Sequence, residues 1–351
     1  MRRTVITIVA FCVLLSTAVA SCGEKTKAAG EVNVYNWGGP YIDESIFREF
    51  QNETGIKVNY SEYQSNEEMY SLLKMGGTNM DVIFPSDYMV ARLIEEEMLE
   101  ELDFSNIPNY RLIDDSYRGL DFDPDGKYSV AYMTGTVGLI YNSAMITEEV
   151  VSWASLFDSR YTGQIVMFDN SRDAFGIALK LLGYSQNTAN EGEIREAFDL
   201  LMVQKPLLQA YVMDQILSKL ESGEAWIGPY YAGDYLIMVE NNPDLRFVRP
   251  VEGSNFFIDS MCIPRGAQNK TNAEVFIDFM CRTDIALRNM EEVMYASANR
   301  EAVDAYGEDM DPEEFEIIFA SRETLSNCEV FTNLPRDILV LYNELWGELK
   351  K

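Results

Sequence analysis

The sequence contains no histidine. This absence excludes the Ser-His and Cys-His nucleophilic schemes, a histidine general base, and the metal sites that are built with imidazole. The sequence also has no nucleophile elbow, P-loop, glycine-rich dinucleotide turn or zinc motif. Carboxylate chemistry stays open, because 57 acidic residues could include a catalytic pair. We therefore expect neither a metal site nor a cofactor.

Basic residues are scarce as well. There are 28 of them against 57 acidic residues, which gives a net charge of −29. Such a surface repels phosphate backbones and anionic lipid head groups, so nucleic acid is excluded as a partner. The acidity favours a cationic ligand, but it is equally consistent with simple solubility.

Long hydrophobic runs are missing after the N-terminus. Arg2 and Arg3 precede an apolar run of 16 residues, Val5 to Ala20, which is shorter than the roughly 20 residues that a membrane span requires. The run ends in Val19-Ala20-Ser21-Cys22, which looks like a bacterial lipobox. We expect residues 1–22 to be a lipoprotein signal peptide with its lipidation site, and 23–30 a tether. An ordinary secretory signal with an incidental cysteine is the alternative.

This interpretation predicts a protein of the periplasm or cell envelope that is lipid-anchored through Cys22 and otherwise does not enter the membrane.

Cysteine is rare beyond that point. Cys262, Cys281 and Cys328 remain, an odd number. Cys262 lies in an apolar strand-like run and Cys281 on an apolar helix, which favours buried thiols over a disulfide bridge.

What the sequence does contain is an alternation of strands and helices from residue 31 onward. This rhythm predicts an α/β fold with a mainly parallel sheet. Ser65 and Glu68 form a capping box at the start of one helix. The length of 351 residues suits about two domains, yet no linker separates two halves. We therefore expect the backbone to cross between two lobes more than once. The predicted strands are 32–35, 56–60, 81–84, 137–141, 165–168, 225–228, 246–249 and 256–263.

Polar and aromatic residues follow several of these strands, where open α/β sheets usually bind ligands. The segments are 35–37, 85–88, 169–173 and 229–231. Taken alone, Trp37 or Tyr88 suits ordinary packing, and Asp169 or Ser171 suits a helix N-cap. Asp259 is different, because a carboxylate within an apolar strand is costly unless a charge meets it. Its partner is either an arginine, such as Arg265 or Arg300, or the ammonium group of a ligand.

Several stretches, in order and spacing across almost the whole mature chain, resemble the spermidine/putrescine-binding proteins of polyamine ABC transporters. These stretches are 35–37 (YNW), 50–60 (FQNETGIKVNY), 62–69, 84–88 (FPSDY), 182–185 (LGYS) with 187–188, and 257–260 (FIDS) with 263–264. The resemblance implies a type II periplasmic binding fold, in which two α/β lobes close around a ligand. It implies one lobe of 31–136 plus 259–304, another of 137–258 plus 305–350, and hinges near 137, 259 and 305.

The resemblance also implies a ligand-binding site with aromatic walls for methylene groups and carboxylates for ammonium groups. Its function would be to capture putrescine or spermidine and pass it to the membrane permease of an ABC importer, without catalysis. The site residues carried over are Trp37, Tyr41, Ser86, Tyr88, Asn170, Asp173, Tyr231, Phe257, Asp259 and Tyr295. Gly39 and Asn170 stand where relatives carry acids, so we hypothesise that the chain tolerates or prefers a diamine such as putrescine.

Three other functions compete with this one. Tyr230-Tyr231 resembles the tyrosine pair of ferric-ion-binding proteins of the same fold. Asp173 and Asp259 could form the carboxylate pair of a lipoprotein hydrolase. A surface lipoprotein with an adhesive role fits the charge and the anchor, but it does not account for the aromatic and acidic set.

Overall fold

The computed structural model describes residues 30–39, 41–76, 79–308, 310–321 and 323–351. The predicted signal peptide, Cys22 and nearly all of the tether lie outside these residues. In the described part of the chain, every helix is too short or too polar to cross a membrane.

The chain alternates strands and helices, as the sequence predicted. The strands are β1 (Gly30–Trp37), β2 (Ile56–Tyr63), β3 (Val82–Ile83), β4 (Ser129–Asn142), β5 (Ile165–Phe168), β6 (Leu208–Val212), β7 (Ile227–Tyr231), β8 (Leu245–Val248), β9 (Phe256–Cys262) and β10 (Ala296–Ser297). The helices are α1 (Ile46–Thr54), α2 (Asn66–Met75), α3 (Asp87–Glu95), α4 (Ser171–Leu181), α5 (Glu191–Gln204), α6 (Gln215–Glu221), α7 (Ala232–Asn241), α8 (Lys270–Met280), α9 (Thr283–Val293), α10 (Arg300–Gly307), α11 (Pro312–Ile318) and α12 (Arg336–Leu349). Short 3-10 helices are η1 (Phe104–Asn106), η2 (Pro108–Leu112), η3 (Asp115–Tyr117), η4 (Trp153–Phe157), η5 (Ser159–Tyr161) and η6 (Lys205–Leu207). The α/β class is confirmed.

Local sequence signals set several of these boundaries. Ser65 caps α2, because its hydroxyl accepts a hydrogen bond from the Glu68 N–H at 3.1 Å. The reciprocal bond of the predicted capping box is displaced by one residue, since the Glu68 carboxylate accepts from the Gln64 N–H at 2.7 Å. Gly55 ends α1 with a φ of 79°, a left-handed conformation that glycine adopts without strain.

The sheet is mixed rather than mainly parallel. Its strand order is β2-β1-β3-β9-β4-β7-β5-β6, with β8 and β10 also paired to β4. β1 pairs in parallel with β2 and β3, and β5 with β6 and β7. β4 and β9 are antiparallel to each other and to their other neighbours. The βαβ rhythm therefore describes the two ends of the sheet but not its centre.

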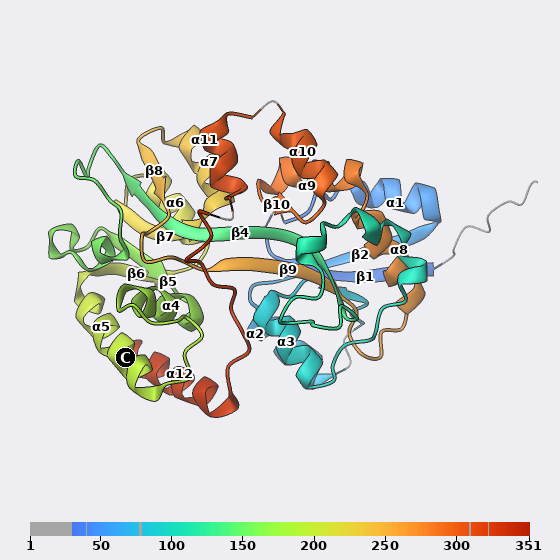
Figure 1. Ribbon diagram of the computed structural model, residues 1–351, viewed down its shortest axis with the longest axis horizontal. Helices are drawn as coiled ribbons and strands as arrows, with labels where there is room; N and C mark the ends of the chain where they lie inside the picture. Colours follow the sequence, from blue (N-terminus) through green and yellow to red (C-terminus); the bar gives the residue numbers. More distant parts are fainter. Residues whose placement is uncertain (1–29, 40, 77–78, 309, 322) are drawn as a thin grey trace, which may run out of the picture.

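β4 and β9 connect the two halves of the molecule, and they run side by side across its middle (Figure 1). Residues 129–136 of β4 pair with β9, whereas residues 137–142 pair with β7 and β8. One strand thus belongs to both halves of the sheet. The prediction of a short strand at 137–141 captured only its second part.

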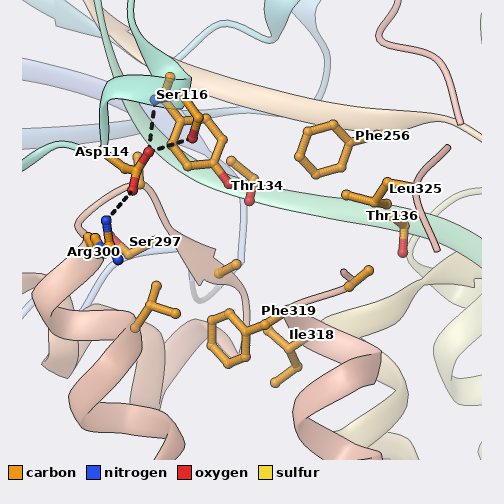
Figure 2. A pocket seen from close by; sticks show the side chains of 15 residues that line it. Asp114, Ser116, Thr134, Thr136, Phe256, Ser297, Arg300, Ile318, Phe319 and Leu325 are labelled. Carbon is orange, nitrogen blue, oxygen red and sulfur yellow. Dashed lines mark hydrogen bonds and ion pairs between the residues drawn. The ribbon is translucent and has the colours of Figure 1, made fainter. Parts of the chain in front are cut away.

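A cavity of about 200 Å³ lies beside β4, between α10 and α11 (Figure 2). It is termed here the β4 cavity. Its lining residues include Thr134, Thr136, Phe256, Ser297, Val303, Ile318 and Phe319.

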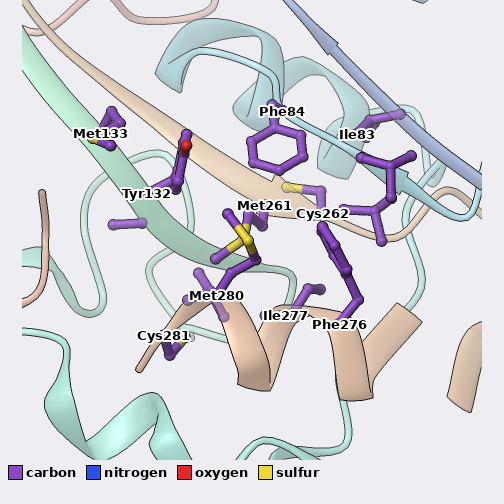
Figure 3. Close-up of a cluster of buried hydrophobic side chains, with 14 of the residues drawn as sticks. Ile83, Phe84, Tyr132, Met133, Met261, Cys262, Phe276, Ile277, Met280 and Cys281 are labelled. Atoms are coloured by element: carbon purple, nitrogen blue, oxygen red, sulfur yellow. The ribbon is translucent and has the colours of Figure 1, made fainter. Parts of the chain in front are cut away.

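Two hydrophobic cores lie on either side of the crossing strands. The first gathers side chains from 32–133 and 257–302, and the second chiefly from 137–245 and 318–349. Part of the first core is shown in Figure 3, where Cys262 and Cys281 lie among apolar side chains. Both thiols are buried and unpaired, as predicted.

The elements around each core are termed the first and second lobe. The predicted hinge positions stay a prediction.

Candidate functional site

Asp259 lies in β9 and is only 4% exposed. The Ser86 hydroxyl donates to its Oδ1 at 2.6 Å, and the Tyr41 hydroxyl donates to its Oδ2. Neither arginine considered above reaches it. Arg265 pairs with Glu97 on the surface, and the nearest acids to Arg300 are Asp114 and Asp304. The carboxylate is thus held by two neutral hydroxyls in the described part of the chain. Burial raises its pKa to about 6.

The start of α3 carries two of the predicted site residues, Ser86 and Tyr88. The Asn66 side-chain amide donates to the Ser86 hydroxyl and to the Tyr88 hydroxyl, at 3.1 Å each. The Tyr88 hydroxyl in turn donates to Glu67 at 3.0 Å. Asn66 is 3% exposed, so this network is fixed from beneath. The first turn of α2 therefore orients Tyr88 and also Ser86, which donates to Asp259.

Trp37 ends β1 and is half-buried. Its indole N–H donates to the Phe84 carbonyl at 2.8 Å, and its ring lies 5.2 Å from that of Tyr63. The hydrogen bond uses the polar edge of the indole and locks the side chain to the strand end before Ser86. The ring is therefore available as a fixed wall rather than as a mobile surface group.

Four predicted aromatic residues form one contiguous group. The Tyr295 ring centroid lies 5.7 Å from those of Tyr41 and Phe257, and 6.5 Å from that of Tyr231. Tyr231 and Phe257 are themselves 5.7 Å apart and close to perpendicular. Tyr231 lies within β7, because that strand runs to residue 231 instead of ending at 228 as predicted.

Asp173 lies in the first turn of α4 and is 9% exposed. Among the described residues no hydrogen-bond donor reaches its carboxylate, and burial raises its pKa to about 7 although the Arg172 charge opposes this. Burial also raises the pKa of Tyr231 well above its ordinary value, and the charges of Asp173 and Asp259 raise it further. The charges of both predicted carboxylates, one from each lobe, thus raise the pKa of the same phenol.

Asn170 has a structural task. Its side-chain oxygen accepts the Arg172 N–H at 2.8 Å and caps α4. The expectation that Asp169 or Ser171 provides this cap is wrong, and Asp169 instead accepts from Lys350 at 2.7 Å. A further role for Asn170 in ligand binding stays a prediction.

Arg172 was not among the predicted residues. Its guanidinium lies 4.6 Å from the Phe331 ring centroid and 5.6 Å from that of Tyr88, and it donates to Asn187 and to the Thr332 carbonyl, both at 3.2 Å. This cation is thereby held by rings and neutral oxygens. It leaves the nearby carboxylate of Asp173 without a direct ion pair.

Two more acids were missed. Asp87 is 1% exposed and accepts from the N–H groups of Tyr88 at 2.6 Å and Ile258 at 3.1 Å. Burial raises its pKa to about 8, with a contribution from the charge of Asp259. Asp234, on α7, accepts from the Tyr295 hydroxyl, and burial raises its pKa to about 6. The position of Asp87 between two predicted residues was the available signal. No signal in the sequence pointed to Asp234.

The arrangement has a clear chemical preference. Buried carboxylates without matching cations have raised pKa values because their charged form lacks solvation, and an entering cation removes this cost. The surrounding rings present negative faces that also attract a cation. Burial of the phenols raises the pKa of both Tyr230 and Tyr231, which opposes the phenolate form that a ferric ion requires.

Comparisons with known proteins agree with this geometry. Residues 45–315 match the sequence profile of a family described as bacterial extracellular solute-binding proteins. The chain is 32% identical over 318 residues to a spermidine/putrescine-binding periplasmic protein of Salmonella typhimurium, with 90% of each chain covered.

Two solved structures are similar as well. One is a Listeria monocytogenes protein described as a spermidine/putrescine ABC transporter, with a TM-score of 0.85, 38% identity, and 91% and 98% of the two chains covered. The other is a spermidine/putrescine ABC transporter substrate-binding protein of Streptococcus pneumoniae, with a TM-score of 0.79, 33% identity, and coverage of 92% and 99%. The predicted periplasmic binding fold is confirmed.

Proposed function

The chain belongs to the family of bacterial extracellular solute-binding proteins, and from this premise we propose that it is the polyamine-capturing component of an ABC importer. Putrescine or spermidine binds between the two lobes, and the loaded protein delivers it to the membrane permease. The relatives named above are solute-binding transport proteins rather than enzymes, and the same role is proposed for this chain.

The observation that carries the proposal is the state of Asp259. This carboxylate is buried in an apolar strand, and among the described residues only the hydroxyls of Ser86 and Tyr41 hold it. Neither arginine considered as its partner approaches it. A primary ammonium group has three donors and a full positive charge, so it supplies what two neutral hydroxyls cannot.

The neighbouring groups suit the rest of an elongated cation. Asp173 stands on the second lobe without a hydrogen-bond donor in the described structure, and it would take a second ammonium group. The rings of Tyr231, Phe257 and Tyr295 would enclose the methylene chain between the two charges. An ammonium over such a face gains roughly 0.5–2 kcal/mol, depending on how far it is desolvated.

Titration calorimetry tests this function directly. The mature protein should bind putrescine, spermidine or both with saturation, and it should not bind lysine or ferric ion at the same concentrations. Absence of heat or of a thermal shift with every di- and triamine would refute the proposal. The ratio of the putrescine and spermidine dissociation constants also decides the diamine hypothesis, which fails if spermidine binds far more tightly.

Attachment to the membrane is a separate part of the proposal. We propose that Cys22 carries the lipid and that the protein is held near its permease in the cell envelope, which raises the local concentration of loaded protein. The substitution Cys22→Ala should move the protein from the membrane fraction to the soluble fraction and abolish labelling by a fatty-acid analogue. Retention and labelling of the variant would refute the anchor without touching the binding function.

A further inference from the structure

Asp87 is a buried acid between two of the predicted site residues, Ser86 and Tyr88. It is the first residue of α3 and is 1% exposed. Its Oδ1 accepts the N–H of Tyr88 at 2.6 Å, and its Oδ2 accepts the N–H of Ile258 at 3.1 Å. One carboxylate thus joins the main chain of α3 to that of β9.

The bond to Ile258 continues the pairing between β3 and β9. These strands are antiparallel, and their register extends past the end of β3. The Ser260 N–H donates to the Pro85 carbonyl at 3.0 Å, and Ser86 pairs with Asp259 at the next position. In an antiparallel ladder every second pair of opposite residues is hydrogen-bonded. The N–H of Ile258 is therefore the next group of β9 that requires an acceptor.

The side chain of Asp87 provides this acceptor. Residue 87 is opposite Ile258 in the register, but its main chain has already turned into α3, so its carboxylate takes the place of a main-chain carbonyl. Its other oxygen accepts the Tyr88 N–H, which belongs to the first turn of the helix and has no partner within it. Two N–H donors require two acceptor oxygens, and a carboxylate offers both, whereas an amide offers one.

Asp259 lies between the two anchored N–H groups of β9, those of Ile258 and Ser260. Its Oδ1 accepts from the hydroxyl of Ser86, the residue just before Asp87, at 2.6 Å. The Asp87 carboxylate therefore fixes the main chain on both sides of this contact. It holds β9 just before Asp259, and it holds the start of α3 just after Ser86.

We propose that Asp87 is a positioning residue for polyamine binding, which keeps Asp259 and Ser86 in register so that the Asp259 carboxylate meets an ammonium group of the ligand. It acts through Asp259 and not by contact with the ligand. A binding group is effective only where its supporting residues hold it to within about 0.5 Å. This role rests on the proposed function, whereas the attachment of β9 to α3 by Asp87 does not.

Two substitutions test the proposal, each alone and in combination with Asp259→Asn. Asp87→Asn keeps one acceptor oxygen, and Asp87→Ala removes both. The matched control is Asp81→Asn. Asp81 is 0% exposed and also accepts from two main-chain N–H groups, those of Asn33 at 2.8 Å and Asn269 at 2.9 Å.

The measurements are calorimetric titration with putrescine and spermidine at pH 9, and hydrogen exchange of the Ile258 amide in the unliganded protein by NMR. Burial raises the pKa of Asp87 to about 8, so its carboxyl group is mostly ionised at pH 9. A primary ammonium group, with a pKa of roughly 10, is still mostly charged at this pH.

Asp87→Asn should raise the Kd for polyamine about three- to tenfold, and Asp87→Ala about ten- to fiftyfold, because they remove one and both of the hydrogen bonds. In the Asp259→Asn background, Asp87→Asn should leave the Kd unchanged, since the charge that it positions is already absent. Asp87→Ala should also speed the exchange of the Ile258 amide by about tenfold or more. The control Asp81→Asn should keep the wild-type Kd and the wild-type exchange at Ile258.

Folded Asp87 variants with the wild-type Kd would overturn the proposal. The same rise in Kd with and without Asp259→Asn would also overturn it, because Asp87 would then act independently of Asp259. If Asp87→Ala does not fold, Asp87→Asn decides through the double variant. If the wild type binds no polyamine, the proposed function fails, whereas the exchange of the Ile258 amide still decides whether Asp87 holds β9 in place.

Discussion

Replacing Asp259 by asparagine separates the contribution of its charge from that of its shape. The amide keeps an oxygen that can accept from Ser86, and its NH₂ group can donate to the Tyr41 hydroxyl. The packing of β9 is therefore preserved. Only the negative charge is lost, and it is lost from a side chain that is 4% exposed.

Stability should rise. Burial raises the pKa of Asp259 from 3.8 to about 6, and each pKa unit corresponds to about 1.4 kcal/mol, so the ionised carboxylate costs the unliganded fold about 3 kcal/mol above pH 6. The Asp259→Asn variant avoids this cost. We expect its Tm without ligand to rise by several degrees, on the order of 5 °C.

Binding should weaken at the same time. Removing one partner of a buried charge pair costs about 3 kcal/mol or more, which corresponds to a roughly 100-fold or larger increase in Kd for putrescine or spermidine. The assays are differential scanning calorimetry of the unliganded protein and calorimetric titration at pH 7.5. Asp199→Asn is the control, because it makes the same change at an exposed position on α5. A variant with the Tm and polyamine affinity of the wild type would refute the reasoning.

Three further predictions follow from the same geometry. Lowering the pH from 8 to 5 should weaken polyamine binding in calorimetric titrations, because Asp173 and Asp259, with pKa values raised to about 7 and about 6, become protonated in this range. The unliganded protein should become more stable over the same range, because its folded state binds these protons more readily than the unfolded state. A pH-independent Kd would contradict the first of these two expectations. Trp37→Leu should raise the Kd for putrescine by roughly 2- to 30-fold without a large change in Tm, because it removes an aromatic ring whose interaction with an ammonium group contributes about 0.5–2 kcal/mol of binding free energy. An unchanged Kd would show that Trp37 is not part of the site. Gly233→Ala should lower the Tm and weaken binding together, because an added Cβ would lie 2.0 Å from the Tyr295 ring, and a variant with wild-type Tm would show that this contact yields.

Much of the fold follows from local patterns. The alternation of short apolar strands with capped helices identified the α/β class, and Ser65 begins a helix where the sequence indicated. Local patterns failed at the centre of the sheet. β4 and β9 pair with each other although more than 100 residues separate them, and no local signal determines which distant strand a segment will join.

The site divides in the same way. The sequence by itself determined that Asp259 needs a partner, since a carboxylate in an apolar strand is costly wherever the strand lies. Only the tertiary structure decided what surrounds it: two hydroxyls, from Ser86 and Tyr41, in place of an arginine. The physical reason is that the cost of burying a charge depends on one residue and its neighbours in the chain, whereas the groups that offset the cost are brought together by the path of the whole backbone.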